Sequence, residues 1–96
     1  MQDSFTNLMF YLLEGTRGGE TRTRILDALF KRPMNKNQLA KTVKLDYKTV
    51  EHHLKLLVEN DFLSIIKKGS YGAVYLPSQT LRSSKKEFDE IKERFG

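Results

Sequence analysis

The first part of the chain has apolar residues at helical spacing. The positions i, i+3, i+4 and i+7 are occupied by Phe5, Leu8, Met9 and Leu12, which predicts a helix. Three further residues make this helix apolar on most sides: Phe10, Tyr11 and Leu13. Such a helix needs burial on more than one face. In so short a chain the second covering surface can belong to another subunit, although an intramolecular core helix or a buried strand also fits this apolar run.

A second helix is predicted over residues 22–30. Its inner stripe consists of Ile25, Ala28 and Leu29. Arg32 ends this helix, because it precedes Pro33 and a residue before proline is pushed out of helical geometry. The three glycines between residues 15 and 19 break the helical pattern and predict a loop between the two helices.

Residues 35–58 predict two short helices separated by a tight turn at Lys44. Asn35 can cap the first helix and Gln38 completes a capping box, while Asp46 can cap the second helix. Each cap is accompanied by an apolar pair of the hydrophobic-staple type: Met34 with Leu39, and Leu45 with Val50. Two capped helices this close together are typical of a helix-turn-helix, whose second helix commonly enters the DNA major groove.

The remaining pattern predicts a hairpin and a last helix. Residues 62–67 and 73–76 form two strands joined by a turn over residues 68–72, and Pro77 closes the hairpin. A helix then follows over residues 79–95, with a seam of heptad-like spacing interrupted by one polar residue: Leu81, Ser84, Phe88, Ile91 and Phe95. The element order predicts a mainly α fold with a small β-hairpin, a winged helix-turn-helix flanked by terminal helices.

Length and composition limit the classes of protein that fit. Ninety-six residues form one domain, which we divide into an N-terminal helix and loop (1–19), a winged-helix core (20–77) and a C-terminal helix (78–96). A chain of this length buries roughly 60–65% of its unfolded surface, so a dimer interface would help its modest core. The chain has no cysteine, which excludes disulfides, thiolate metal sites and cysteine nucleophiles.

No segment is predicted to enter a membrane. The longest apolar run, residues 8–13, is far shorter than the about 20 residues that span a bilayer. Asp3 precedes this run and no basic residue does, unlike a secretory signal. A cytoplasmic protein is the simplest interpretation.

The basic charge is concentrated in one part of the chain. The formal net charge is +5, and residues 21–72 alone carry +6, against −2 for residues 1–20 and +1 for residues 73–96. Basic charge around the helix-turn-helix and hairpin suits a polyanionic partner such as nucleic acid. A lysine-rich soluble surface explains the charge alone equally well.

Helical phase selects the residues that face DNA. Val50, Leu54 and Leu57 share the inner face of the second motif helix. The opposite face and the helix start carry the candidate base-contacting residues Tyr47, Lys48, Thr49, Glu51, His52 and Lys55. The alternative for the charged members is a solvated face without a partner.

Each of these candidates has a predicted role. Tyr47 and Thr49 offer apolar or hydroxyl contacts, Lys48 can reach guanine or phosphate, and His52 can donate or accept at a base edge. Glu51 would repel phosphate unless it accepts from a cytosine amino group or pairs with Lys48 or Lys55.

Further backbone contacts are predicted outside that helix. The hairpin tip offers Lys67, Lys68, Ser70 and Tyr71, which can lie along the DNA backbone or enter the minor groove. Lys36 and Asn37, at the start of the first motif helix, can meet a phosphate through free backbone N–H groups. An ordinary polar hairpin turn is the alternative for the tip.

Metal binding and catalysis find no support in the sequence. His53 flanks the buried stripe, and we expect it to be packed and bonded to backbone. His52 and His53 point about 100° apart on a helix and cannot readily hold one metal ion. Gly15 to Gly19 lack the spacing and lysine of a phosphate loop. We therefore predict no metal site, no cofactor and no enzymatic activity.

Three segments together resemble the ArsR-like winged-helix transcription regulators, especially their archaeal members: TRTRILDALF, NQLAKTVKLDYKTVEHHLKLLVENDFL and YGAVYLPS. The most specific part is KTVEHHLKLLVENDFL, and the resemblance covers about residues 20–77. It implies a dimeric DNA-binding repressor or activator whose terminal helices build the dimer. Family members that sense metals use cysteines in the recognition helix or Asp/His pairs in the last helix; this chain has no cysteine, and its last helix has Asp89 but no histidine.

The resulting hypothesis is a homodimeric regulator that binds specific sequences of double-stranded DNA. Its predicted dimer interface consists of Phe5, Leu8, Met9, Leu12, Leu81, Phe88, Ile91 and Phe95. The alternatives are a winged-helix module that binds proteins of the transcription machinery and a protein that coats DNA without sequence preference. The sequence does not reveal target genes, the sign of regulation or an effector.

Overall fold

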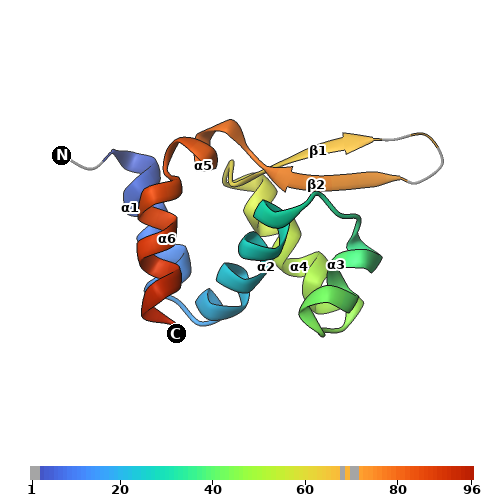
Figure 1. Ribbon diagram of the computed structural model, residues 1–96, viewed down its shortest axis with the longest axis horizontal. Coiled ribbons are helices and arrows are strands. Elements are labelled where there is room, and N and C mark those ends of the chain that lie inside the picture. Colours follow the sequence, from blue (N-terminus) through green and yellow to red (C-terminus); the bar gives the residue numbers. More distant parts are fainter. Residues whose placement is uncertain (1–2, 68, 70–71) are drawn as a thin grey trace.

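The computed structural model describes residues 3–67, 69 and 72–96, and it has the predicted winged-helix order (Figure 1). The elements are α1 (Ser4–Glu14), α2 (Gly19–Lys31), α3 (Lys36–Val43), α4 (Tyr47–Glu59), β1 (Leu63–Lys67), β2 (Ala73–Pro77), α5 (Gln79–Ser83) and α6 (Lys85–Arg94). The hairpin projects from one end of the molecule, and α1 and α6 lie side by side at the other end. The prediction of a mainly α fold with one small hairpin is confirmed.

The start signals predicted for the two motif helices are confirmed. The Asn35 carboxamide accepts from the Gln38 N–H at 2.8 Å, and the Gln38 side chain accepts from the Asn35 N–H at 2.9 Å, which completes the capping box. Asp46 accepts from the Thr49 N–H at 3.1 Å at the start of α4. Lys44 adopts a left-handed conformation with φ 59° between the helices. These local bonds fix where both helices begin.

The core beneath the motif follows the predicted stripes. Val50, Leu54 and Leu57 of α4 are buried, as are Ile25, Ala28 and Leu29 of α2. Met34 and Leu39, the predicted apolar pair around the first cap, are buried as well. The exposed face of α4 is therefore the face that the helical phase predicted.

The hairpin is tied to the segment between α2 and α3. Its antiparallel register pairs Leu63 with Pro77 and Lys67 with Ala73, so Pro77 is the last residue of β2. Met34 adds a short third pairing, because its N–H donates to the Tyr75 carbonyl at 3.2 Å and its carbonyl accepts from the Tyr75 N–H at 2.8 Å. This pairing holds the base of the hairpin beside the start of α3.

The prediction of one continuous C-terminal helix is wrong. The chain forms α5 and α6 with a break at Ser84, whose N–H bonds to the Leu81 carbonyl at 2.9 Å. Ser83 and Ser84 are weak helix formers, and the buried Ser84 lies between the end of α5 and the start of α6. Phe95 follows the end of α6 and is 40% exposed.

Most of the predicted dimer residues are also core residues of the single chain. Five of the eight are already buried within the single chain: Met9, Leu12, Leu81, Phe88 and Ile91. Phe5 and Leu8 are only partly buried, and the Phe5 ring packs on Phe62 with centroids 4.6 Å apart. The apolar seam of the terminal helices is thus covered mainly by the chain itself. Tyr11, 59% exposed, and Phe95 leave more apolar surface open than the five buried residues.

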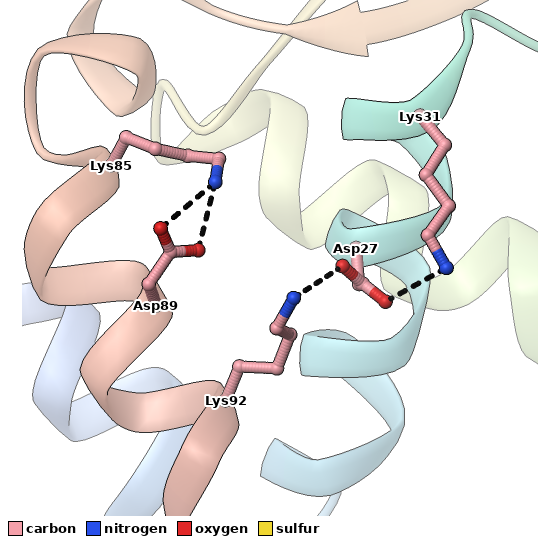
Figure 2. Close-up of polar contacts among 5 residues, drawn as sticks. All are labelled: Asp27, Lys31, Lys85, Asp89 and Lys92. Atoms are coloured by element: carbon pink, nitrogen blue, oxygen red, sulfur yellow. Dashed lines mark hydrogen bonds and ion pairs between the residues drawn. The ribbon is translucent and has the colours of Figure 1, made fainter.

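Polar contacts also hold α6 against its own chain (Figure 2). Lys92 of α6 donates to Asp27 of α2 at 3.1 Å, and Lys31 approaches the other oxygen of the same carboxylate at 3.5 Å. Phe88 packs on Phe30 of α2 with ring centroids 5.1 Å apart. Partly exposed ion pairs contribute little free energy, so the buried aromatic ring supplies most of the stabilisation of this contact.

None of the helices in the described part of the chain is long and apolar enough to cross a membrane.

Candidate nucleic-acid interface

The exposed face of α4 forms one wall of an open groove. This groove has a volume of about 760 Å³, and its other wall comes from the hairpin. Four of the residues predicted from helical phase line it on the α4 side: Lys48, Glu51, His52 and Lys55. The other lining residues are Lys36 of α3, Leu54, Val58 and Glu59 of α4, and Ile65 and Tyr75 of the hairpin. The structure therefore brings predicted residues of α3 and α4 together with the base of the hairpin.

Glu51, one of two acidic residues that line the groove, has a different partner from the predicted one. Glu51 does not pair with Lys48 or Lys55; its carboxylate accepts from the Lys36 ammonium at 2.8 Å. This hydrogen bond lowers the pKa of Glu51 and raises the pKa of Lys36. The pair joins α3 to α4 across fifteen positions of sequence, a contact that helical spacing within α4 cannot reveal.

The first turn of α4 is partly exposed to solvent. Tyr47 is 44% exposed, and the Lys36 ammonium lies 5.9 Å from the centroid of its ring. The Thr49 hydroxyl donates to the Asp46 carboxylate, and these side-chain and backbone hydrogen bonds from Thr49 lower the pKa of Asp46. Thr49 is partly buried, so its hydroxyl first serves the helix cap and Tyr47 is the more accessible of the two predicted contacts.

A smaller hollow continues the groove at the start of α3. It has a volume of about 250 Å³ and is lined by Asn35, Lys36, Asn37, Tyr47, Gly72, Ala73 and Tyr75. Lys36 and Asn37, predicted to meet a phosphate, therefore lie beside the start of α4 and the part of β2 nearest the hairpin turn. Lys67 is exposed at the end of β1. The predicted contacts Lys68, Ser70 and Tyr71 lie outside the described residues.

The two histidines of α4 face different surroundings. His52 is exposed in the groove, and the ring of His53 is partly buried on the flank of the helix. The expected backbone bond of His53 is not the contact that forms: its Nδ1 lies 3.4 Å from Nη1 of Arg22. No group of three or more possible metal ligands occurs within the described ranges.

Two features around α4 were not predicted from the sequence: the hairpin side of the groove and the contact of His53 with Arg22. Ile65 and Tyr75 pair across the hairpin and share the face that looks onto α4. The two-residue alternation of each strand could have assigned them to one face, but it could not identify the helix opposite. The Arg22–His53 contact spans 31 positions of sequence, and no local signal predicts it.

Comparisons with known proteins agree with this geometry. Residues 19–64 match the family model described as "Bacterial regulatory protein, arsR family". This segment runs from α2 through the helix-turn-helix into β1, just under half of the chain. No curated protein sequence matches the chain.

Several solved structures share the fold. The reduced form of the transcriptional regulator YodB from B. subtilis has a TM-score of 0.76 at 19% identity, over 97% of this chain and 90% of YodB. The transcriptional regulator BldR from Sulfolobus solfataricus has a TM-score of 0.72 at 15% identity, over 95% of this chain. The transcriptional repressor CouR, bound to a 23-mer DNA duplex, has a TM-score of 0.70 at 11% identity, over 91% of this chain.

These likenesses establish the winged-helix fold. The chain spans 65% of BldR and 63% of CouR, so those chains contain additional segments.

Proposed function

We propose that this chain is a transcriptional regulator that binds specific sequences of double-stranded DNA as a homodimer, with α4 in the major groove and the hairpin on the backbone or in the minor groove. The observation that carries this proposal is the groove that combines the exposed face of α4 with Lys36 and the hairpin base. The arsR-family match over residues 19–64 and the DNA-bound CouR neighbour support it. Within this proposal residues 1–96 act as a single domain.

The exposed face of α4 suits base contacts. Lys48, His52 and Lys55 project from the helix into the groove beside Tyr47 at the helix start, and recognition helices meet base edges mainly through such positions. Lysine can donate to the O6 and N7 acceptors of guanine, and the Tyr47 ring can contact a thymine methyl group. These contacts would supply sequence preference.

Lys36 and Glu51 form a pair that DNA would reorganise. A phosphate near the start of α3 attracts the Lys36 ammonium, which now bonds Glu51 at 2.8 Å. Once released, the Glu51 carboxylate can accept from a cytosine N4 amino group. Glu51 then contributes specificity. At a base pair without such a donor, its carboxylate would lie unpaired near the negative charge of the DNA.

Lys67 is proposed to contact the DNA backbone without reading sequence. Replacing it by alanine should weaken binding to all duplexes alike and reduce the slope of log affinity against log salt by about 0.9 for one lost phosphate contact. Binding measured by fluorescence anisotropy at several salt concentrations tests this. A change in the preferred sequence would instead assign Lys67 to base reading.

The proposed homodimer uses surface that the single chain leaves open. Leu8 and Tyr11 lie three residues apart on α1, and Tyr11 is 59% exposed. Two copies related by a two-fold axis would place their α4 helices about 34 Å apart, in successive major grooves. The binding site is then an imperfect palindrome with half-sites one helical turn apart.

Tyr11→Glu is expected to weaken the dimer by about tenfold or more, because it places a charge in an interface where tyrosine commonly contributes much of the affinity. Sedimentation equilibrium of the parent and the variant measures this. Ile66→Glu is the matched control, since Ile66 is also an exposed apolar residue but lies on the hairpin. A monomeric parent would refute the dimer, and an unchanged Tyr11→Glu dimer would place its interface elsewhere.

The decisive test is selection from random duplexes near physiological salt, followed by sequencing of the retained DNA. Recovery of a palindrome with one-turn spacing supports the proposal. Retention without a motif would favour DNA coating, and no retention would favour a protein-binding module of the transcription machinery. The resemblance to archaeal family members and the cytoplasmic location remain predictions from the sequence.

A further inference from the structure

Arg22 is a buried cation that lies between three parts of the fold. Only 5% of its surface is exposed, and burial lowers the pKa of its guanidinium. Nε and Nη2 donate to the Leu12 carbonyl at 3.0 and 2.8 Å, and Nη2 also donates to the Thr16 hydroxyl and the Arg17 carbonyl. Within the described part of the chain it forms no ion pair. Neutral oxygens at the end of α1 and in the loop after it therefore hold this charge.

The remaining contact of the guanidinium reaches the recognition helix. Nη1 lies 3.4 Å from Nδ1 of His53. Arginine can only donate hydrogen bonds, so Nδ1 must accept, and the imidazole must be neutral with its proton on Nε2. A protonated His53 would place an N–H group and a positive charge against the guanidinium.

Gly18 makes this close approach possible. Its φ is 87°, in the left-handed region, and a Cβ at this position would lie 2.9 Å from Nη1 of Arg22 and 3.1 Å from Cε1 of His53. The loop between α1 and α2, the start of α2 and the flank of α4 thus meet at one point. A change in the His53–Arg22 contact acts on all three elements.

The groups that face His53 favour its neutral form. Burial lowers the pKa of His53 below its ordinary value of 6.5, and the charges of Arg22 from α2 and His52 from α4 lower it further. A group whose folded pKa is depressed stabilises the fold fully above its unfolded pKa and loses that stabilisation as pH falls through the folded pKa. The sensitive range therefore begins near pH 6.5 and extends to lower pH.

We propose that neutral His53 is a positioning residue, which fixes the recognition helix to the α1–α2 loop through Arg22, and that its protonation releases this contact. The chain would then sense acid at a point that joins the end of α1 and the α1–α2 loop to its DNA-facing helix. The proposal goes beyond DNA binding, because the contact and its response to protons exist in the free protein.

His53→Asn tests this proposal, since the asparagine oxygen can accept from Arg22 but does not titrate. Urea unfolding of the parent at about pH 7.5 and about pH 5.5 should show a fall of the midpoint, and the variant should lose part of that fall. His52→Asn is the matched control and should retain most of the fall, because His52 is exposed, does not contact Arg22 and is the smallest of the three causes that lower the pKa of His53. An equal fall in parent and His53→Asn would overturn the proposal.

NMR of the parent keeps the test valid if the variant folds poorly. The His53 ring should carry its proton on Nε2 at neutral pH and titrate below 6.5. The amide signals of Arg17, Gly18 and the residues around His53 should shift with the same midpoint. A proton on Nδ1 at neutral pH, or amides that ignore the His53 titration, would contradict the assignment.

A final measurement asks whether the His53–Arg22 contact affects DNA affinity. The role of His53 in the free protein does not depend on its result. The parent and His53→Asn should be compared on one duplex at both pH values, because both proteins keep His52 and differ only at position 53. The affinity of the parent should fall relative to that of the variant at the lower pH. If neither protein binds DNA, the function proposed above fails, while the unfolding and NMR results still decide the role of His53.

Discussion

Replacing Phe88 by alanine is expected to lower the free energy of unfolding by about 3–5 kcal/mol, because it removes a fully buried ring and leaves a cavity. Phe88 is 0% exposed within the single chain and packs on Phe30 of α2 at 5.1 Å between ring centroids. Such a loss is a large part of the stability of a domain this small. Urea unfolding followed by circular dichroism measures it.

The same experiment separates a core residue from a dimer residue. If Phe88 belongs to the core of the chain, the loss should be the same at low and high protein concentration. Phe95→Ala is the control, since Phe95 is 40% exposed beyond the end of α6, and it should cost less than about 1 kcal/mol. If Phe88→Ala changed only the dissociation of the dimer, Phe88 would belong to the interface, as the sequence predicts.

Lys48→Ala is expected to weaken binding to the selected DNA site by about 1–3 kcal/mol if Lys48 donates to guanine. Lys48 projects from the first turn of α4 into the groove, where recognition helices meet base edges. Anisotropy titrations with the selected duplex and with a version changed at one base pair measure both affinity and discrimination. The discrimination at that base pair should fall together with the affinity.

A charge-matched control separates this contact from general electrostatics. Lys86 is an exposed lysine of α6 and lines a hollow beside α1, away from the α4 groove. Lys86→Ala removes the same charge and should leave affinity nearly unchanged. If Lys48→Ala binds its best site as tightly as the parent, α4 does not read DNA through this face.

Local signals predicted the motif because their partners lie close in sequence. The capping box joins Asn35 and Gln38, three positions apart, and Asp46 caps α4 through Thr49 at the same distance. The inner stripe of α4 follows from helical periodicity alone. Capping hydrogen bonds and helical phase involve residues only three or four positions apart. They can therefore be predicted from the local sequence.

The C-terminal region shows where periodicity misled. The spacing of Leu81, Phe88 and Ile91 predicted one helix, and all three side chains are buried as that spacing requires. The break at Ser84 nevertheless separates α5 from α6. Apolar spacing identifies residues that need burial, but it does not fix a continuous helix axis, because a change of direction can keep the same residues buried.

The sequence by itself determined the order of the elements, the caps of the motif helices and the exposed face of α4. Tertiary structure alone decided what each face meets: Lys36 pairs with Glu51, Arg22 reaches His53, and Lys92 of α6 bonds Asp27 across 65 positions. The physical reason is that hydrophobic burial is non-directional. An apolar stripe indicates only that a helix face must be buried. The packed chain shows whether another helix of the same chain or a second molecule buries it.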